Sequence, residues 1–174
     1  MTATVTRTGR ARRLGKSARR AWLVTHIVSS GAWIGLDVVL AVLIFTAMFT
    51  SDTAVAAISY QALQLFTVWP LLIIGLVCLA SGIVLGVGSK YGLLRYWWVA
   101  VKLGLNIVLT VLGVVALRPG VDDAAVYGRA LAAGLTPAPV PDLIFPPIVS
   151  PVCLLIAVLL SVYKPWGRTA KGRA

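Results

Sequence analysis

Hydrophobic residues along this chain gather in four long blocks that are separated by short polar segments. The blocks cover about residues 22–49, 65–87, 97–117 and 144–163. A helix of about 20 apolar residues crosses the hydrocarbon core of a bilayer, and the blocks lack the alternation that is typical of barrel strands. We therefore predict an all-α, integral membrane four-helix bundle over residues 21–164.

Composition favours the same class of protein. The 174 residues are 59% hydrophobic and 12% charged, and the sequence contains no glutamate. A soluble domain of this length needs a polar shell that so few charged residues cannot build. The net charge of +11 lies in short flanks of the hydrophobic blocks rather than on a folded face, so we expect no nucleic-acid partner.

The charged residues predict how the spans are oriented. Residues 1–20 hold seven basic residues and no acidic one, and further basic residues follow the second and fourth spans, namely Lys90, Arg95, Lys164, Arg168, Lys171 and Arg173. The opposite loops carry four aspartates and two arginines, a net charge of −2. By the positive-inside rule, both termini face the cytoplasm of a bacterial plasma (inner) membrane. Residues 1–20 are then a basic arm and residues 165–174 a basic tail.

The basic arm also raises the alternative of a signal peptide, for which "AVA" at residues 54–56 offers a cleavage site. The first hydrophobic block is far longer than the roughly 7–15 apolar residues of a signal peptide, and it contains Asp37, so we expect it to be retained. An arginine-rich arm can also bind anionic lipid or RNA. A topology determinant is the role we predict.

The longest predicted connection runs from Arg118 to Pro141. Its stretch "DDAAVYGRALAAG" suits one short helix, with Asp122 near the start and Gly134 at the end. The stretch "TPAPVP" then predicts an extended link into the fourth span.

One polar stripe runs along the first span. A rotation of about 100° per residue places five residues within an arc of about 100°, namely His26, Ser29, Ser30, Trp33 and Asp37. Asp37 lies about 22 Å along the helix axis from Trp22. A charge at such depth costs roughly 2.5–3.5 kcal/mol on insertion scales, so we expect the stripe to face the bundle interior.

Three ionisable residues of the spans have alternative roles. Lys102, which shares a face of the third span with Asn106, can extend its ammonium group back to the headgroups. His26 suits either a hydrogen bond near the interface or a haem or metal ligand. Asp37 must be paired, hydrated or protonated, which fits both interhelical hydrogen bonding and a proton or cation site.

Small residues mark the second span. "GIVLG" places Gly82 and Gly86 in a GxxxG motif, and Gly75 lies seven residues before Gly82 on nearly the same face. Such motifs let helices approach closely. We expect packing within the bundle, with homodimerisation as the alternative.

Several chemistries lack the residues they need. One histidine cannot supply bis-histidine haem ligation within one chain, and Cys78 and Cys153 lack the spacing of zinc ligands, so we expect plain buried thiols. Serine, histidine and aspartate on one helix cannot converge as a catalytic triad. We predict no catalytic residue and no cofactor, with haem or copper at His26 as the alternative.

Two stretches and the spacing between them carry a family resemblance: "THIVSSGAWIGLDVVLAVLIF" and "PLLIIGLVCLASGIVLGVGSKYGLLRYWWVAVKLGLNIVLTV". Over about residues 20–120, the chain resembles an uncharacterised family of small four-span actinobacterial membrane proteins. The matching positions are His26, Trp33, Gly35, Gly82, Gly86, Gly92, Leu93, Arg95, Tyr96, Trp97 and Lys102. Tyr91 stands where the family usually has tryptophan, and Asp37 lies outside the pattern.

A more distant resemblance is to four-helix membrane proteins of the copper-resistance-D and protoporphyrinogen-oxidase types. Those proteins bind copper or haem through additional histidines, which this chain lacks. The resemblance therefore implies a shared scaffold.

The sequence thus predicts a non-enzymatic accessory or partner subunit in the membrane. One alternative is a small proton- or cation-coupled transporter that uses Asp37, His26 and Lys102. The other is a haem- or metal-handling protein with His26 as ligand. The expected partners are the lipid bilayer and either another membrane protein or a second copy of the chain.

Overall fold

The computed structural model describes residues 14–89, 91–138 and 143–169, and this part of the chain contains helices and no strand. The elements are α1 (Lys16–Phe49), α2 (Thr53–Thr67), α3 (Trp69–Val87), α4 (Trp97–Leu112), the π-helical turn η1 (Gly113–Leu117), α5 (Arg118–Ala132) and α6 (Pro146–Tyr163). Four stretches are long and apolar enough to cross a membrane. The predicted all-α, four-span architecture is confirmed.

Some predicted features lie outside the described residues. They are residues 1–13 of the basic arm, Lys90, Asp142 and residues 170–174 of the basic tail.

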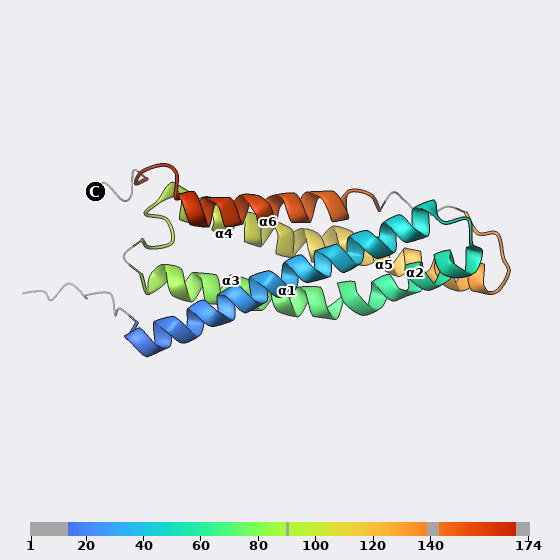
Figure 1. Ribbon diagram of the computed structural model, residues 1–174, viewed down its shortest axis with the longest axis horizontal. Coiled ribbons are helices and arrows are strands. Elements are labelled where there is room, and N and C mark those ends of the chain that lie inside the picture. The colour runs from blue at the N-terminus through green and yellow to red at the C-terminus, as the bar shows by residue number, and fades with distance from the viewer. Residues whose placement is uncertain (1–13, 90, 139–142, 170–174) are drawn as a thin grey trace, which may run out of the picture.

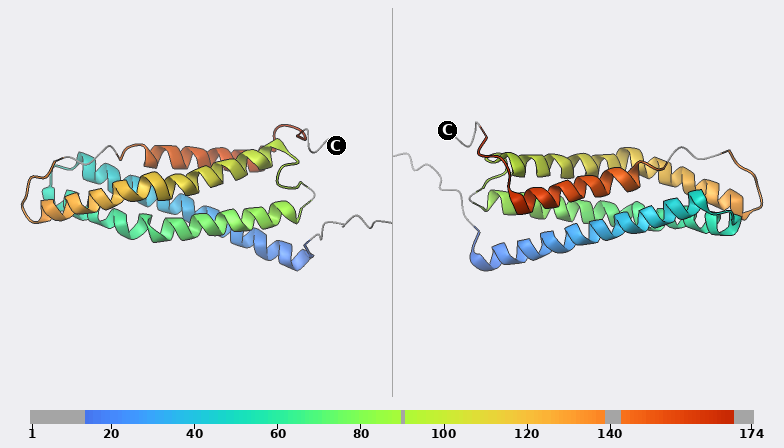
Figure 2. Two further views of the ribbon diagram at one scale, coloured as in Figure 1. Left: turned by 180° about the vertical axis from the view of Figure 1, so that it is seen from behind. Right: turned by 45° about the horizontal axis from the view of Figure 1, so that its top comes forward.

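The helices form an elongated bundle, which α1 crosses obliquely (Figures 1 and 2). At one end, here called the proximal end, α1 and α4 begin and α3 and α6 end; the opposite, distal end holds the start of α2 and the end of α5. Helix α1 contacts α2, α3 and α6, whereas α2 packs along α5 and α4 packs against α3 and α6. The outward faces of α4 and α6 are rich in exposed valine, leucine and isoleucine, as expected for helices that acyl chains surround.

Three of the membrane-crossing stretches extend beyond the spans predicted from the sequence. The first begins at Lys16, within the predicted basic arm, rather than near Trp22. The second begins at Thr53 rather than near Leu65, because Asp52 caps α2 by accepting hydrogen bonds from the backbone amides of Ala54 (2.8 Å) and Val55 (3.2 Å). It is interrupted only at Val68, between α2 and α3.

The third stretch continues through η1 into α5. The short helix predicted from about Asp122 therefore begins earlier, at Arg118, with no loop before it, and extends as far as Ala132. In η1 the amide of Arg118 donates to the carbonyl of Gly113, five residues earlier. The predicted helix end is where the sequence places it, because Gly134 adopts the left-handed backbone conformation (φ 76°) that ends helices.

Close packing joins α2 and α5 at the distal end. Gly128 is buried, and a Cβ atom there would lie 2.7 Å from the carbonyl oxygen of Ala57 and 2.9 Å from Cβ of Tyr60. The side-chain amide of Gln61 donates through Nε2 to the backbone carbonyls of both Ala57 (3.1 Å) and Gly128 (3.4 Å). Tyr60 also contacts Tyr127 edge to face, at 5.2 Å between ring centroids.

The three long stretches exceed what a bilayer requires. They contain 34, 35 and 36 residues, which is about 50 Å of helix, whereas the hydrocarbon core is about 30 Å thick. About 20 Å of each helix can therefore extend beyond the hydrocarbon core at one side. We call α2, α5 and the last turns of α1 the distal extension.

At the proximal end, the segment after α6 is tied to the connection between α3 and α4. The amide of Thr169 donates to the carbonyl of Arg95 (3.0 Å), and its hydroxyl donates to the carbonyl of Leu94 (2.6 Å). The first residues of the predicted tail are therefore part of the fold.

Candidate functional site

The polar stripe of α1 faces other helices of the bundle. Ser29, Trp33 and Asp37 are 5%, 2% and 3% exposed, and His26 and Ser30 are half-buried. The stripe divides into three groups at different depths, of which the first two contact α3 and the third contacts α6.

The first group surrounds the thiol of Cys78. His26 Nδ1 lies 3.0 Å from Ser81 Oγ and 3.1 Å from the carbonyl oxygen of Cys78. Because a carbonyl can only accept, this geometry fits Nδ1 as the protonated ring nitrogen. Ser30 Oγ (3.3 Å) and Asn106 Nδ2 (3.4 Å) both lie within hydrogen-bond distance of Cys78 Sγ. These five residues, from α1, α3 and α4, form the Cys78 cluster.

The Cys78 cluster is the feature that the sequence interpretation missed. The sequence predicts that Cys78 behaves as a small hydrophobic residue, and it is buried and free as predicted, but two neighbouring helices, α1 and α4, place polar groups beside its sulfur. The available signal was the pair Cys78 and Ser81, three residues apart and therefore on one face of the second span.

Large side chains of other segments pack against the glycines of α3. A Cβ atom at Gly82 would lie 3.2 Å from His26 Cε1, and one at Gly75 would lie 3.3 Å from two ring carbons of Trp33. A Cβ atom at Gly86 would overlap the side chain of Leu93. These contacts lie within one chain, which agrees with the packing within the bundle that the GxxxG motif predicts.

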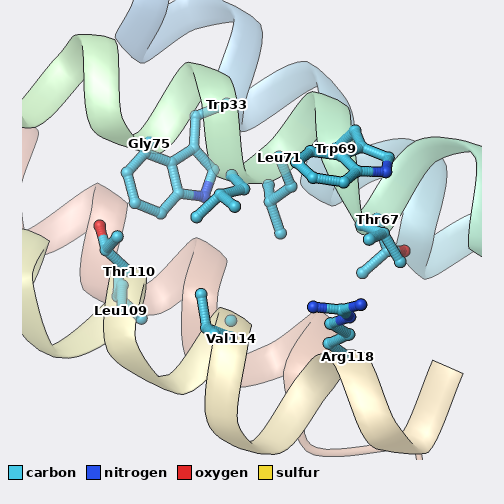
Figure 3. A pocket seen from close by; sticks show the side chains of 12 residues that line it. Trp33, Thr67, Trp69, Leu71, Gly75, Leu109, Thr110, Val114 and Arg118 are labelled. Atoms are coloured by element: carbon cyan, nitrogen blue, oxygen red, sulfur yellow. The ribbon is translucent and has the colours of Figure 1, made fainter. Parts of the chain in front are cut away.

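The second group is Trp33 together with a small cavity of about 40 Å³ (Figure 3). The cavity lies where α1, the α2–α3 junction and the π-helical turn meet, and Thr67, Gly75, Val114 and Arg118 contribute to its lining. Among the described residues, Trp33 Nε1 and Thr67 Oγ1 are the buried side-chain nitrogen and oxygen atoms that have no hydrogen-bond partner. An unsatisfied buried group costs about 1–3 kcal/mol. We call this site the Trp33 pocket.

The third group pairs Asp37 with α6. Asp37 Oδ2 accepts a hydrogen bond of 2.7 Å from the hydroxyl of Ser150. Asp37 also lines an apolar groove between α1 and α6, together with Val38, Phe45 and Pro151. The carboxylate is therefore held by a neutral partner on a neighbouring helix.

Lys102 lies apart from the stripe. Its ammonium donates to Ser161 Oγ on α6 (2.8 Å) and lies 5.0 Å from the ring centroid of Trp98. Ser161 belongs to the last turn of α6, so the side chain of Lys102 extends toward the proximal end, as expected for a lysine that reaches for the headgroups. Asn106 shares its helix face but belongs to the Cys78 cluster.

The predicted transporter residues are thus not brought together. His26 contacts α3, whereas Asp37 and Lys102 contact α6 through different serines. His26 and Asp37 are separated by about 16 Å along the axis of α1. In the part of the chain that the structure describes, no three histidine, cysteine or acidic side chains gather in a way that could hold a metal ion.

No protein-family model, curated protein sequence or solved structure matches this chain. The family resemblances seen in the sequence therefore stay predictions.

Proposed function

We propose that this protein is a non-enzymatic subunit of a membrane-protein assembly, and that its distal extension contacts the partner. By the positive-inside rule, the proximal end would lie in the cytoplasm and the distal extension on the outer side of a bacterial plasma membrane. The support comes from the pairing of the ionisable groups and, above all, from the apolar face of α2.

The ionisable groups inside the spans favour a structural role. His26, Asp37 and Lys102 each bond to a neutral serine hydroxyl of a neighbouring helix. Interhelical hydrogen bonds of this kind hold membrane helices together. None of these three bonds joins two of the ionisable groups.

The observation that carries the proposal is an exposed apolar face on α2 that continues past the level expected for the membrane surface. Val55, Ile58 and Leu65 lie on one side of α2 and are 39%, 68% and 73% exposed. Near Leu65, Gln64 donates to Asp122 Oδ1 (2.8 Å), and Arg118 lies 3.9 Å from the same carboxylate.

Polar and charged residues of this kind belong at the headgroups or in water, so Leu65 lies near the expected outer surface of the bilayer. Val55 and Ile58 lie about 10–15 Å further along α2. Lipid can cover the face at Leu65, but the part at Val55 and Ile58 needs another cover. An apolar helix of a neighbouring membrane protein provides one.

A photo-crosslinking residue at Ile58 tests the proposal in native membranes. The matched control carries the same residue at Asp123, which is exposed on α5. We expect a protein adduct from position 58 and none from position 123. We also expect Ile58→Asp to abolish co-purification of the partner in mild detergent while the helix content stays unchanged.

An adduct with a second copy of the chain would identify the partner as a homodimer mate. Adducts with lipid alone at position 58, combined with a single chain in mild detergent, would refute the proposal. A reporter fused to the C-terminus that is active only outside the cell would refute the assumed orientation.

A further inference from the structure

The Trp33 pocket has a chemistry of its own, which the proposed contact through α2 does not use. Its most informative group is the indole N–H of Trp33, in a side chain that is 2% exposed. An indole N–H donates and cannot accept. An occupant of the pocket must therefore present a hydrogen-bond acceptor. The hydroxyl of Thr67, at the end of α2, is a second buried group without a partner that lines the same pocket.

The π-helical turn adds a positive charge to the lining. Arg118 directly follows η1 and lines the pocket, on the side opposite Thr67 and Trp69 (Figure 3). Its ion pair with Asp122 is long, at 3.9 Å through Nε, and Asp122 also accepts from Gln64. The planar guanidinium fork suits an oxyanion such as a carboxylate or phosphate.

The remaining walls are mainly apolar. Leu71 of α3 faces Leu109 of α4 and Val114 of η1 across the gap. Leu72 also lines the pocket. The internal volume of about 40 Å³ is room for a group of a few heavy atoms, since one water needs about 10–15 Å³ on this measure. A small polar head with an apolar chain fits these walls better than a sugar or a nucleotide.

We propose that the Trp33 pocket binds the oxyanion group of an acyl-chain amphiphile that enters from the bilayer. The indole N–H of Trp33 and the guanidinium of Arg118 bind the oxygen atoms, and the acyl chain leaves along Leu109 and Val114. The oxyanion is either the carboxylate of a free fatty acid or the phosphate of an anionic lipid.

The test measures retention of labelled palmitate by the full-length protein in a neutral detergent. Hexadecanol, which has the same chain and no charge, is the ligand control, and vesicles of phosphatidylglycerol supply the lipid phosphate. In protein with ¹⁵N-labelled tryptophan, we expect palmitate or phosphatidylglycerol, but not hexadecanol, to shift the indole N–H resonance of Trp33. The resonance is assigned by its loss in Trp33→Phe.

Two variants remove the proposed donors. Arg118→Gln and Trp33→Phe should each weaken binding of the oxyanion about ten-fold or more, as expected for loss of a hydrogen bond to a charged group. Arg129→Gln, which removes an exposed arginine of the same helix outside the pocket, should leave binding unchanged. Far-UV circular dichroism verifies that each variant is folded.

The two oxyanion sources are distinguished by which of them displaces the other. Palmitate that phosphatidylglycerol cannot displace identifies a fatty-acid site, and the reverse identifies a lipid-phosphate site. Equal retention of hexadecanol and palmitate would overturn the proposal. So would oxyanion binding that is unaffected in both folded variants, or an indole resonance that none of the ligands shifts.

Discussion

Replacement of Gly128 by alanine probes the contact on which the distal extension depends. A Cβ atom at this position would lie 2.7 Å from the carbonyl oxygen of Ala57 and 2.9 Å from Cβ of Tyr60. Both neighbours are close to the α2 backbone and cannot rotate away as the end of a long side chain can. The substitution therefore forces α2 and α5 apart.

Two opposing effects set the magnitude. Overpacking of a close interface costs about 1–3 kcal/mol, while alanine stabilises a helix by about 1 kcal/mol relative to glycine. Gly104→Ala is the matched control, because nothing lies within 4 Å of a Cβ atom there. The control gains the helix propensity without the clash. We therefore expect Gly128→Ala to be less stable than Gly104→Ala by about 1–3 kcal/mol.

Unfolding by sodium dodecyl sulfate in mixed micelles, followed by far-UV circular dichroism, measures this difference. Both variants are compared with the unaltered protein in the same micelles. If Gly128→Ala is as stable as Gly104→Ala, the α2–α5 contact is looser than described, and it does not stabilise the distal extension.

The remaining predictions concern the spans. Gly82→Val should displace the imidazole ring of His26, which lies against this glycine. The loss of the contact between His26 Nδ1 and Ser81 Oγ should appear as a shifted histidine resonance in NMR spectra. A membrane-permeant maleimide should spare Cys78 until detergent unfolds the protein, because the thiol is buried within the bundle; mass spectrometry that finds Cys78 modified in the folded state contradicts the burial of the cluster. A double-mutant cycle of Asp37→Ala and Ser150→Ala should give a coupling energy of about 0.6 kcal/mol, the usual size for membrane helices, and a value near zero in the same unfolding assay would show that the bond of 2.7 Å contributes no stability.

The number of spans could be predicted because hydrophobic block length is a strong signal. The bounds of the second and third stretches could not, because α2 and α5 are stabilised by each other. Small buried residues such as Ala57 and Gly128 carry that contact, and neither is distinctive in a single sequence. The sequence predicts a short helix from about Asp122 to Gly134, but it does not show that this helix continues without a break from the third span.

The candidate sites were predictable only in part. Rotation along one helix shows that His26, Trp33 and Asp37 face inward, since 3.6 residues complete a turn. It does not show which helix each residue meets. The sequence places Trp33 in the polar stripe, but the pocket beside it forms only where α2, α3 and η1 meet, and a π-helical turn has no signature in this sequence.

The spacing of residues does contain one tertiary signal. His26 and Trp33 are seven residues apart on α1, and Gly82 and Gly75 are seven residues apart on α3, which runs in the opposite direction. Each large ring lies on one glycine, so the two pairs match in a single register. A shift of α1 by one turn toward Gly86 would leave only His26 against a glycine, and a shift in the opposite direction would leave neither ring against one. The glycines therefore select the register that brings Trp33 to its pocket and His26 to Cys78.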